Sequence, residues 1–369
     1  MNKAPATTPP RESNLFGLDY RAEAAKMPRL PYSIIDVHSH INGERAAAVY
    51  REARALYGVG LTYSMTQMPQ AQGVQRILGD TIRFIAVPDY SNKDRAFAHG
   101  EGYIDTISKW HAIGARMVKF WVAPRGRDLG RESGDWRILT LENPWRRRQM
   151  DHAASLGMMF MCHVADPDTW FKTKYTDAAL YGTKRQQYEP LEPLLRDYRR
   201  VPWILAHMGG WPEDLDFLSG LLERHENLHL DTSATKWMVR ELSRHPTDRL
   251  LTFFERWRGR ILFGSDIVTN DGHVGGTPTP GPPTPSAGSI DEAFDLYASR
   301  YWALRTMYES RGDRPSPIAD PDLAMVEPDR FTPLSSPTLR GHALPPDLLR
   351  IVYHDAAANL VNKWWDEHR

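Results

Sequence analysis

The chain alternates between short apolar runs and longer segments with helical spacing. A short apolar run bounded by turn residues is typical of a buried strand. Apolar residues three or four positions apart are typical of a helix that packs on one side. Eight short runs occur in order, at residues 32–40, 58–65, 81–88, 114–122, 156–164, 201–208, 227–234 and 260–267. Helical segments lie between several of them, such as 44–58, 143–157 and 213–226.

This alternation predicts the fold class. Strands that alternate with helices favour a parallel sheet, because parallel neighbours need a crossover connection. Eight such units match a (β/α)8 barrel in number and size. A doubly wound open sheet is the alternative, but no glycine-rich fingerprint follows any of the runs. We therefore predict an α/β fold of the (β/α)8 TIM barrel type.

The domain organisation follows from the segments that do not fit this pattern. Residues 1–28 are polar and contain prolines, which predicts an N-terminal arm, and residues 29–369 are predicted to form a single barrel. Two insertions, at about 272–289 and 311–346, have the composition of solvated loops. The first follows the eighth run, so in a barrel it emerges on the active-site face. It is equally a candidate lid or oligomer contact.

Composition and charge limit the possible partners. Lys plus Arg equals Asp plus Glu at 46 each, so no net charge favours nucleic acid or an anionic membrane. Cys162 is the single cysteine, which excludes an intrachain disulfide and fits a reducing compartment. The N-terminus lacks the apolar core of a signal peptide, and no segment approaches membrane-spanning length. We expect a cytoplasmic protein that acts on a small molecule.

Alternate positions at the end of the first run carry polar side chains. Asp36, His38 and His40 share one face, because residues i, i+2 and i+4 of a strand point the same way. Two neighbouring imidazoles are costly to bury unless something binds them, and a divalent metal is their usual partner. An isolated pair of this kind could equally be two half-exposed histidines at a strand end.

Three other runs also end in metal-binding residue types. The fifth ends at His163, the sixth at His207 and the eighth at Asp266. The C-terminal ends of barrel strands meet at one mouth, so these side chains should come together with the histidine pair. Imidazoles with one carboxylate suit Zn²⁺, and also Mn²⁺, Fe²⁺ or Co²⁺.

Five motifs occur in one order along the chain: "DVHSHI", "CHVADP", "LAHMGG", "LDTSA" and "LFGSDI". This set resembles the amidohydrolase superfamily of metal-dependent hydrolases. More narrowly, it is similar to the amidohydrolase-related branch that includes aminocarboxymuconate-semialdehyde decarboxylase and related lactonases, hydratases and decarboxylases. A barrel of this branch usually holds one divalent metal, Zn²⁺ first, and is often a homodimer.

The resemblance also implies a role for each motif residue. His38, His40, His163 and Asp266 would be the metal ligands. His207 would orient or deprotonate the water that the metal activates, and Asp266 could accept a proton as well. These roles agree with the chemistry, because a histidine with a pKa near neutrality can move a proton at physiological pH.

Asp36 and Lys119 have open roles. Asp36 lies deeper on the face of the histidine pair, where it either fixes the tautomer of a ligand histidine or is a satisfied polar residue. Lys119 shares strand parity with Met117 and Trp121, which places its amine inside the barrel, where it needs a partner or a shifted pKa. Some superfamily members carboxylate a lysine here to bridge two metals, and His163 and His207 would then bind the second. The favoured branch uses one metal, and Lys119 would then meet a substrate carboxylate or be structural.

Four tryptophans follow the motif strands and could form the wall of a pocket for a flat or aromatic substrate: Trp121, Trp170, Trp211 and Trp237. Tryptophan more often packs in the core, so we expect only one or two of them to contact a ligand.

Two reactions fit these residues. The first is hydrolysis of an ester, lactone or amide-type bond by metal-activated water, the commoner chemistry of the superfamily. The alternative is a non-oxidative decarboxylase or hydratase, a lyase acting on an unsaturated or aromatic carboxylic acid. It would need a cation for the acid, and Lys119, Arg125 and Arg127 are available. A barrel that has lost catalysis and only binds a ligand is a third possibility, but every predicted metal position is filled.

Overall fold

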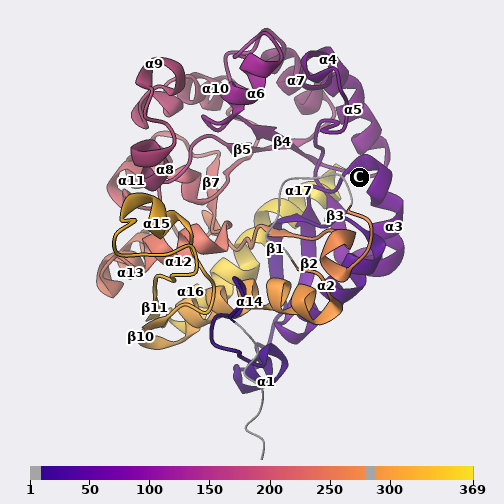
Figure 1. The fold of residues 1–369 in the computed structure, drawn as a ribbon. Coiled ribbons are helices and arrows are strands. Elements are labelled where there is room, and N and C mark those ends of the chain that lie inside the picture. Colours follow the sequence, from indigo (N-terminus) through magenta and orange to yellow (C-terminus); the bar gives the residue numbers. More distant parts are fainter. Residues whose placement is uncertain (1–9, 279–286, 369) are drawn as a thin grey trace, which may run out of the picture.

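Short parallel strands form the centre of the molecule and helices surround them (Figure 1). The computed structural model describes residues 10–278 and 287–368. The central strands are β1 Ile34–His40, β2 Val59–Ser64, β3 Ile82–Phe84, β4 Met117–Trp121, β5 Met159–His163, β6 Trp203–Leu205, β7 Leu228–Asp231, β8 Ile261–Leu262 and β9 Ile267–Val268. Each of the first seven predicted runs contains its strand. The eighth contains β8 and ends at Ile267, the first residue of β9, and Asp266 lies between these two strands.

Hydrogen bonds join two sheets into a closed barrel. One sheet has the order β3–β2–β1–β9, the other has the order β4–β5–β6–β7–β8, and their strand pairs are parallel. Ala86, after β3, forms a parallel bridge with Val118 of β4. The Val37 N–H of β1 donates to the carbonyl of Phe263, directly after β8, at 3.0 Å. The predicted (β/α)8 TIM barrel is confirmed.

Helices follow the strands around the barrel. The longer ones are α2 Glu44–Leu56, α3 Met68–Leu78, α5 Glu101–Ala112, α7 Pro144–Ser155, α11 Leu215–Arg224, α13 Thr247–Arg256 and α14 Ile290–Glu309. Shorter helices are α4 Arg95–His99, α6 Gly126–Glu132, α8 Asp168–Thr173, α9 Ala178–Tyr181, α10 Leu191–Asp197 and α12 Thr235–Leu242. Within the described residues, none of these helices combines the length and the apolar character that crossing a bilayer requires.

Strand parity separates the barrel interior from the layer beneath the helices. Phe120 and Phe160 face outward, with their ring centroids 5.6 Å apart, and the Arg146 guanidinium of α7 lies over the Phe120 ring. Phe160 also contacts Trp203 of β6, at 5.0 Å between ring centroids. Lys119, one residue before Phe120, points the other way and contacts His38 across the interior. Close aromatic packing therefore fixes the strands whose ends carry the predicted site.

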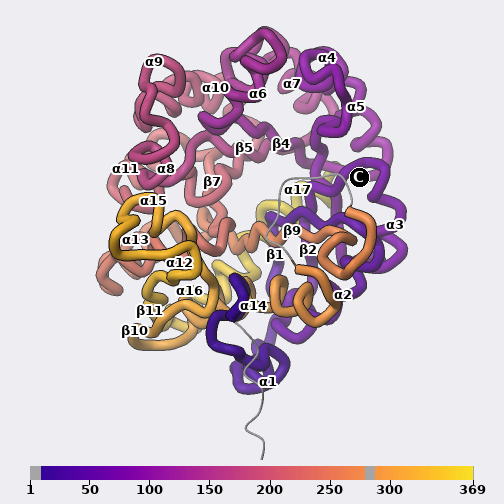
Figure 2. The backbone as a smooth tube through the Cα atoms, in the orientation of Figure 1, coloured from indigo at the N-terminus to yellow at the C-terminus, as the bar shows by residue number. Residues whose placement is uncertain are grey.

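The predicted arm and insertions pack against the barrel where the structure describes them (Figure 2). Helix α1 (Tyr20–Lys26) contacts α2 and α14 and buries Tyr20, so this part of the predicted arm belongs to the packed structure. In the 311–346 segment, β10 (Arg311–Pro315) and β11 (Thr338–His342) pair as an antiparallel hairpin, with α15 (Asp322–Val326) between them. The hairpin packs on α12, α13 and α14. Residues 1–9 of the predicted arm and 279–286 of the first insertion lie outside the described residues.

A mostly helical C-terminal segment packs against β1 and β8 of the barrel. It consists of α16 (Pro346–Arg350), two π-helical turns at Ile351–Asp355 and Ala358–Asn362, and α17 (Lys363–Glu367). The carbonyl of Val352 in this segment accepts a hydrogen bond from Phe263 N–H after β8, which anchors the segment to the barrel.

Candidate metal centre

The C-terminal ends of the barrel strands deliver the predicted site residues to one place. His38 and His40 end β1, Lys119 lies on β4 and His163 ends β5. His207 follows β6 directly, and Asp266 lies between β8 and β9. Because parallel strands end at the same mouth, residues up to 228 positions apart become neighbours there, as His38 and Asp266 do.

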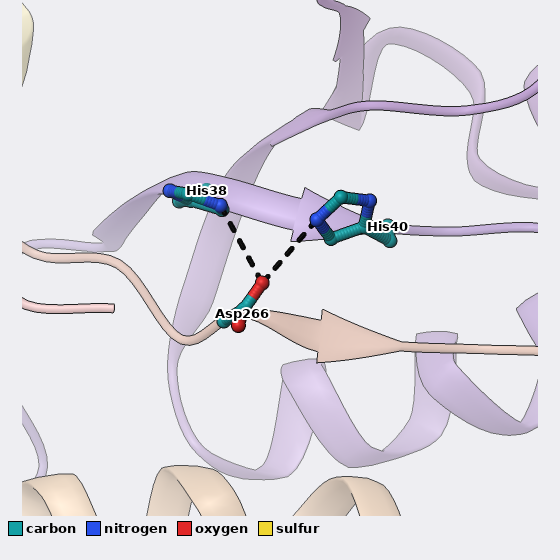
Figure 3. A group of neighbouring side chains, drawn as sticks. All are labelled: His38, His40 and Asp266. Carbon is teal, nitrogen blue, oxygen red and sulfur yellow. Dashed lines mark ion pairs between the residues drawn. The ribbon is translucent and has the colours of Figure 1, made fainter. Parts of the chain in front are cut away.

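Two imidazoles and one carboxylate converge at this mouth (Figure 3). Asp266 Oδ1 lies 3.4 Å from His38 Nε2 and 3.3 Å from His40 Nε2. Two ligand atoms about 2.0–2.1 Å from a tetrahedral Zn²⁺ are separated by about 3.3 Å. The three residues therefore fit one divalent ion in both chemistry and spacing.

Backbone conformation at the strand ends helps to aim these side chains. Asp266 has a φ of 59° and His207 a φ of 60°, values in the left-handed region that residues other than glycine rarely adopt. The Asp266 N–H donates to the His38 carbonyl at 2.8 Å, which holds this turn against β1. Such backbone strain costs energy and concentrates at functional sites.

The Asp266 carboxyl is held in its ionised form. Burial by itself would raise the pKa of Asp266, but the hydrogen bond to His40 and the electrostatic effect of the His207 and His38 rings hold this pKa below its usual range. A carboxylate that is ionised at neutral pH can bind a metal without first losing a proton.

Asp231 and Ser233 are site residues that were not predicted individually, although "LDTSA" was among the family motifs. Asp231 Oδ2 lies 2.8 Å from His38 Nδ1, and Ser233 Oγ lies 3.0 Å from the same nitrogen. Ser233 Oγ also lies 2.8 Å from His207 Nδ1. The sequence did indicate that Asp231 and Ser233 share a face, because they are two positions apart at the end of β7. Nothing in the sequence identified their partners.

Asp36 does not have the tautomer-fixing role considered for it; Asp231 contacts the His38 ring instead. Asp36 accepts hydrogen bonds from the Ser265 hydroxyl at 2.6 Å and from the Tyr301 hydroxyl of α14 at 2.8 Å. Backbone N–H groups of His38 and Ser265 also donate to it, each at 3.1 Å. Asp36 contacts α14 through Tyr301. This agrees with the second role considered for it, that of a buried polar residue whose hydrogen bonds are satisfied. Burial raises the pKa of its carboxyl to about 6.

His163 lies beside the site without joining the converging group. Its Nε2 is 2.9 Å from Asp166 Oδ1, and the other oxygen of Asp166 accepts from the Tyr175 hydroxyl at 2.6 Å. The groups of possible ligand atoms within 4.8 Å of one another among the described residues are His38–His40–Asp266 and His38–His207–Asp231. The ligand role of His163 therefore stays a prediction.

His207 lies between the other imidazoles. Its ring centroid is 4.8 Å from that of His38 and 4.4 Å from that of His163. Burial and the neighbouring charge of His163 hold the pKa of His207 well below its usual value, so the ring is neutral at physiological pH. A neutral imidazole can accept a proton or bind a metal.

Lys119 lies inside the barrel next to the histidine pair, as its parity predicts. Its Nζ is 3.4 Å from His38 Nε2, and the residue is 4% exposed. Burial lowers the pKa of the Lys119 amine to about 8, and the charges of Asp231 and Asp266 offset part of that effect. The amine is close enough to the candidate metal position to serve either role considered for it.

The predicted tryptophans differ in how close they lie to the histidines. Trp237 lies closest to the histidines, with its ring centroid 5.5 Å from that of His207. Trp170 contacts Trp237 at 5.2 Å, and its Nε1–H donates to Asp322 of the 311–346 segment at 2.7 Å. Trp211 stacks on Tyr188 at 5.8 Å, as a packing residue does.

The remaining residues proposed for substrate contacts lie at the end of β4 and in the loop that follows it. Trp121 ends β4 and is half-buried, in register with His163 of β5. Arg125 is exposed, and Arg127 donates to Gln187 at 3.0 Å. A role for these arginines in binding an anionic substrate therefore stays a prediction.

A (β/α)8 barrel whose strand ends bring imidazoles and a carboxylate together has the architecture of a metal-dependent barrel enzyme. The family model described as amidohydrolase matches residues 35–362, which is most of the chain. The chain belongs to the amidohydrolase family, and the superfamily assignment is confirmed. The narrower branch around aminocarboxymuconate-semialdehyde decarboxylase stays a prediction.

Solved structures with a similar course of the chain have low sequence identity. An uncharacterized TIM-barrel protein from Bordetella bronchiseptica has a TM-score of 0.48 and 12% identity, over 90% of this chain and 99% of that chain. HMG-CoA lyase from Bacillus subtilis has a TM-score of 0.40 and 11% identity, over 76% and 94%. The phosphotriesterase homology protein from Escherichia coli, complexed with phosphate in its active site, has a TM-score of 0.38 and 11% identity, over 65% and 83%. A comparison with curated proteins gave no match.

Proposed function

We propose that this protein is a metal-dependent hydrolase that cleaves an ester, lactone or amide-type bond of a small organic substrate. The observation that carries the proposal is the convergence of His38 Nε2, His40 Nε2 and Asp266 Oδ1 at the barrel mouth. These residues would hold one divalent ion, Zn²⁺ first, with His163 as a further ligand. When bound, the ion would supply an activated water and polarise the scissile carbonyl.

The protein's own groups would complete the reaction. His207 would accept a proton at Nε2, because its Nδ1 lies 2.8 Å from the Ser233 hydroxyl. Asp266 would be the second proton acceptor. Trp237 and Trp170 would form an apolar wall that holds a flat substrate and limits the access of water.

A lyase is the second candidate function, and the observation in its favour is Lys119. A buried amine 3.4 Å from His38 Nε2 could hold the carboxylate of an acid whose C–C bond breaks next to the metal. The alternative role for the same amine is carboxylation, which would let it bridge two ions.

Metal content per chain is the first test, measured by elemental analysis on protein purified without chelators or a metal-affinity column. One equivalent of a transition metal supports the mononuclear site. Two equivalents would favour a bridging Lys119, with His163 and His207 on the second ion. No metal, and no uptake on reconstitution, would overturn the proposed function and leave a barrel that only binds a ligand.

Site variants make this test specific. His40→Ala and Asp266→Ala should each lose the metal, because each removes one of three converging ligand atoms. His152→Ala is the matched control, since this histidine lies on α7 and contacts Ser108. Metal-loaded protein assayed with ester and lactone panels, and in parallel for CO2 release from aromatic acids, separates hydrolase from lyase.

A further inference from the structure

Asp231 and Ser233 at the end of β7 connect two imidazoles of the site through one carboxylate and one hydroxyl. His38 Nδ1 lies 2.8 Å from Asp231 Oδ2 and 3.0 Å from Ser233 Oγ. His207 Nδ1 lies 2.8 Å from the same hydroxyl. His38, His207, Asp231 and Ser233 are all buried, so water does not compete for these contacts.

The hydrogen atoms of this group can be assigned one by one. The Ser233 hydroxyl has one hydrogen, and it donates that hydrogen to Asp231 Oδ1. Toward His207 Nδ1 the hydroxyl oxygen can then only accept, so His207 must carry its hydrogen on Nδ1. The same reasoning gives His38 a hydrogen on Nδ1, shared between Asp231 Oδ2 and the Ser233 oxygen.

Asp231 accepts hydrogen bonds at both of its carboxylate oxygens. Its Oδ1 accepts the Ser233 hydroxyl and two backbone N–H groups, from His207 at 2.9 Å and Ser233 at 3.0 Å. Its Oδ2 accepts from His38. A carboxylate that accepts this many hydrogen bonds is an acceptor throughout and cannot itself be the donor to either ring.

We propose that Ser233 is a positioning residue that fixes His207 in the tautomer with its hydrogen on Nδ1, while Asp231 fixes His38 in the same way. Both rings then present an unprotonated Nε2 on the side away from β7. The group His38–His207–Asp231 is consequently a hydrogen-bonded support and not a second metal site, although its atoms are close enough to hold an ion. The tautomers follow from the hydrogen bonds alone. Only the roles of the two Nε2 atoms, metal ligand for His38 and proton acceptor for His207, rest on the proposed function.

The tautomers can be observed directly. In protein labelled with ¹⁵N-histidine, long-range ¹H–¹⁵N correlation spectra distinguish a protonated ring nitrogen from an unprotonated one, with His207→Gln used to assign the His207 signals. At pH 8 in the presence of chelator, His207 should show a protonated Nδ1 and an unprotonated Nε2. If His207 instead carries its hydrogen on Nε2, the tautomer assignment is wrong. That result would not decide whether the protein binds a metal, which the metal analysis measures separately.

Two variants divide the roles of the carboxylate and the hydroxyl. Ser233→Ala should give His207 a mixture of tautomers and leave zinc affinity unchanged, because Asp231 still holds His38. Asp231→Asn should lower zinc affinity by about 10- to 100-fold in competition with a chelating dye. Ser39→Ala is the control, because this buried hydroxyl of β1 donates to the Tyr63 carbonyl and contacts neither ring. An unchanged His207 tautomer in Ser233→Ala, or unchanged zinc affinity in Asp231→Asn, would refute the proposal.

Discussion

Replacement of Arg240 by methionine should destabilise the protein by several kcal/mol, because this arginine is the shared partner of buried carboxylates. Arg240 lies on α12 and is 2% exposed. Its guanidinium pairs with Glu241 and with Asp320 of the 311–346 segment, and it lies 3.3 Å from Asp322 Oδ2. Methionine keeps much of the apolar stem and removes the charge.

The magnitude follows from the burial of the groups left behind. The side chains of Glu241 and Asp320 are 0% and 2% exposed, so neither can recover its hydration when the cation is removed. Loss of one partner from a buried ion pair costs about 3–5 kcal/mol. The exposed pair Arg249–Asp216, with side chains 49% and 86% exposed, is the control, and Arg249→Met should cost less than about 1 kcal/mol.

The loss should also depend on pH. Burial raises the pKa of Asp320, and the positive charge of Arg240 opposes that rise. Without Arg240 the folded protein binds a proton on Asp320 more readily than the unfolded chain does, which restores stability as the pH falls. The destabilisation of Arg240→Met should therefore be smaller at pH 5.5 than at pH 8.

Urea unfolding followed by circular dichroism and tryptophan fluorescence measures these differences. The double variant Arg240→Met with Asp320→Asn should recover part of the loss, because it no longer buries an unpaired charge at position 320. Limited proteolysis should cut the 311–346 segment faster in Arg240→Met, since Asp322 also holds Trp170. A loss no larger than that of Arg249→Met, or no recovery in the double variant, would refute the reasoning.

Three further predictions concern Trp237 beside the histidines, the backbone at Gly210 and the pH dependence of stability. Trp237→Ala should raise KM for whichever substrate the activity panels identify, because its ring lies 5.5 Å from His207, whereas Trp211→Ala should lower stability and leave KM unchanged. Gly210→Ala should destabilise the protein by more than about 2 kcal/mol in urea unfolding, because the new Cβ would lie 2.0 Å from the Ala165 carbonyl oxygen. Gly259→Ala, at a similar positive φ of 76° with open space around it, should cost only about 1 kcal/mol. Because burial raises the pKa of Asp36 from 3.8 to about 6, the folded state keeps this proton where the unfolded chain has released it, and stability should fall by about 3 kcal/mol as the pH rises between those values. That slope, measured with chelator present, should be missing from Asp36→Asn, and an identical pH profile for both proteins would contradict it.

The sequence by itself determined the barrel and the location of the site. The number of barrel units follows from the alternation of strand and helix patterns. Because side chains on a strand alternate in direction, the two-residue repeat shows which strand residues face inward. On that basis Lys119, His38 and Asp266 could be assigned to the same interior. Burying polar residues at the ends of several strands is costly unless they meet and share a ligand, so their convergence could be expected from the sequence.

Only the tertiary structure decided which inward residues contact one another. Asp36 and Asp231 both share a strand face with their neighbours, but the register across the barrel places Asp231, and not Asp36, against the His38 ring. Trp237 lies beside His207, and Trp211 packs on Tyr188, for the same reason. Periodicity along one strand fixes the face of a residue, but not the height of the opposite strand or the rotation of a side chain. Those depend on how distant parts of the chain pack, and only the folded barrel determines them.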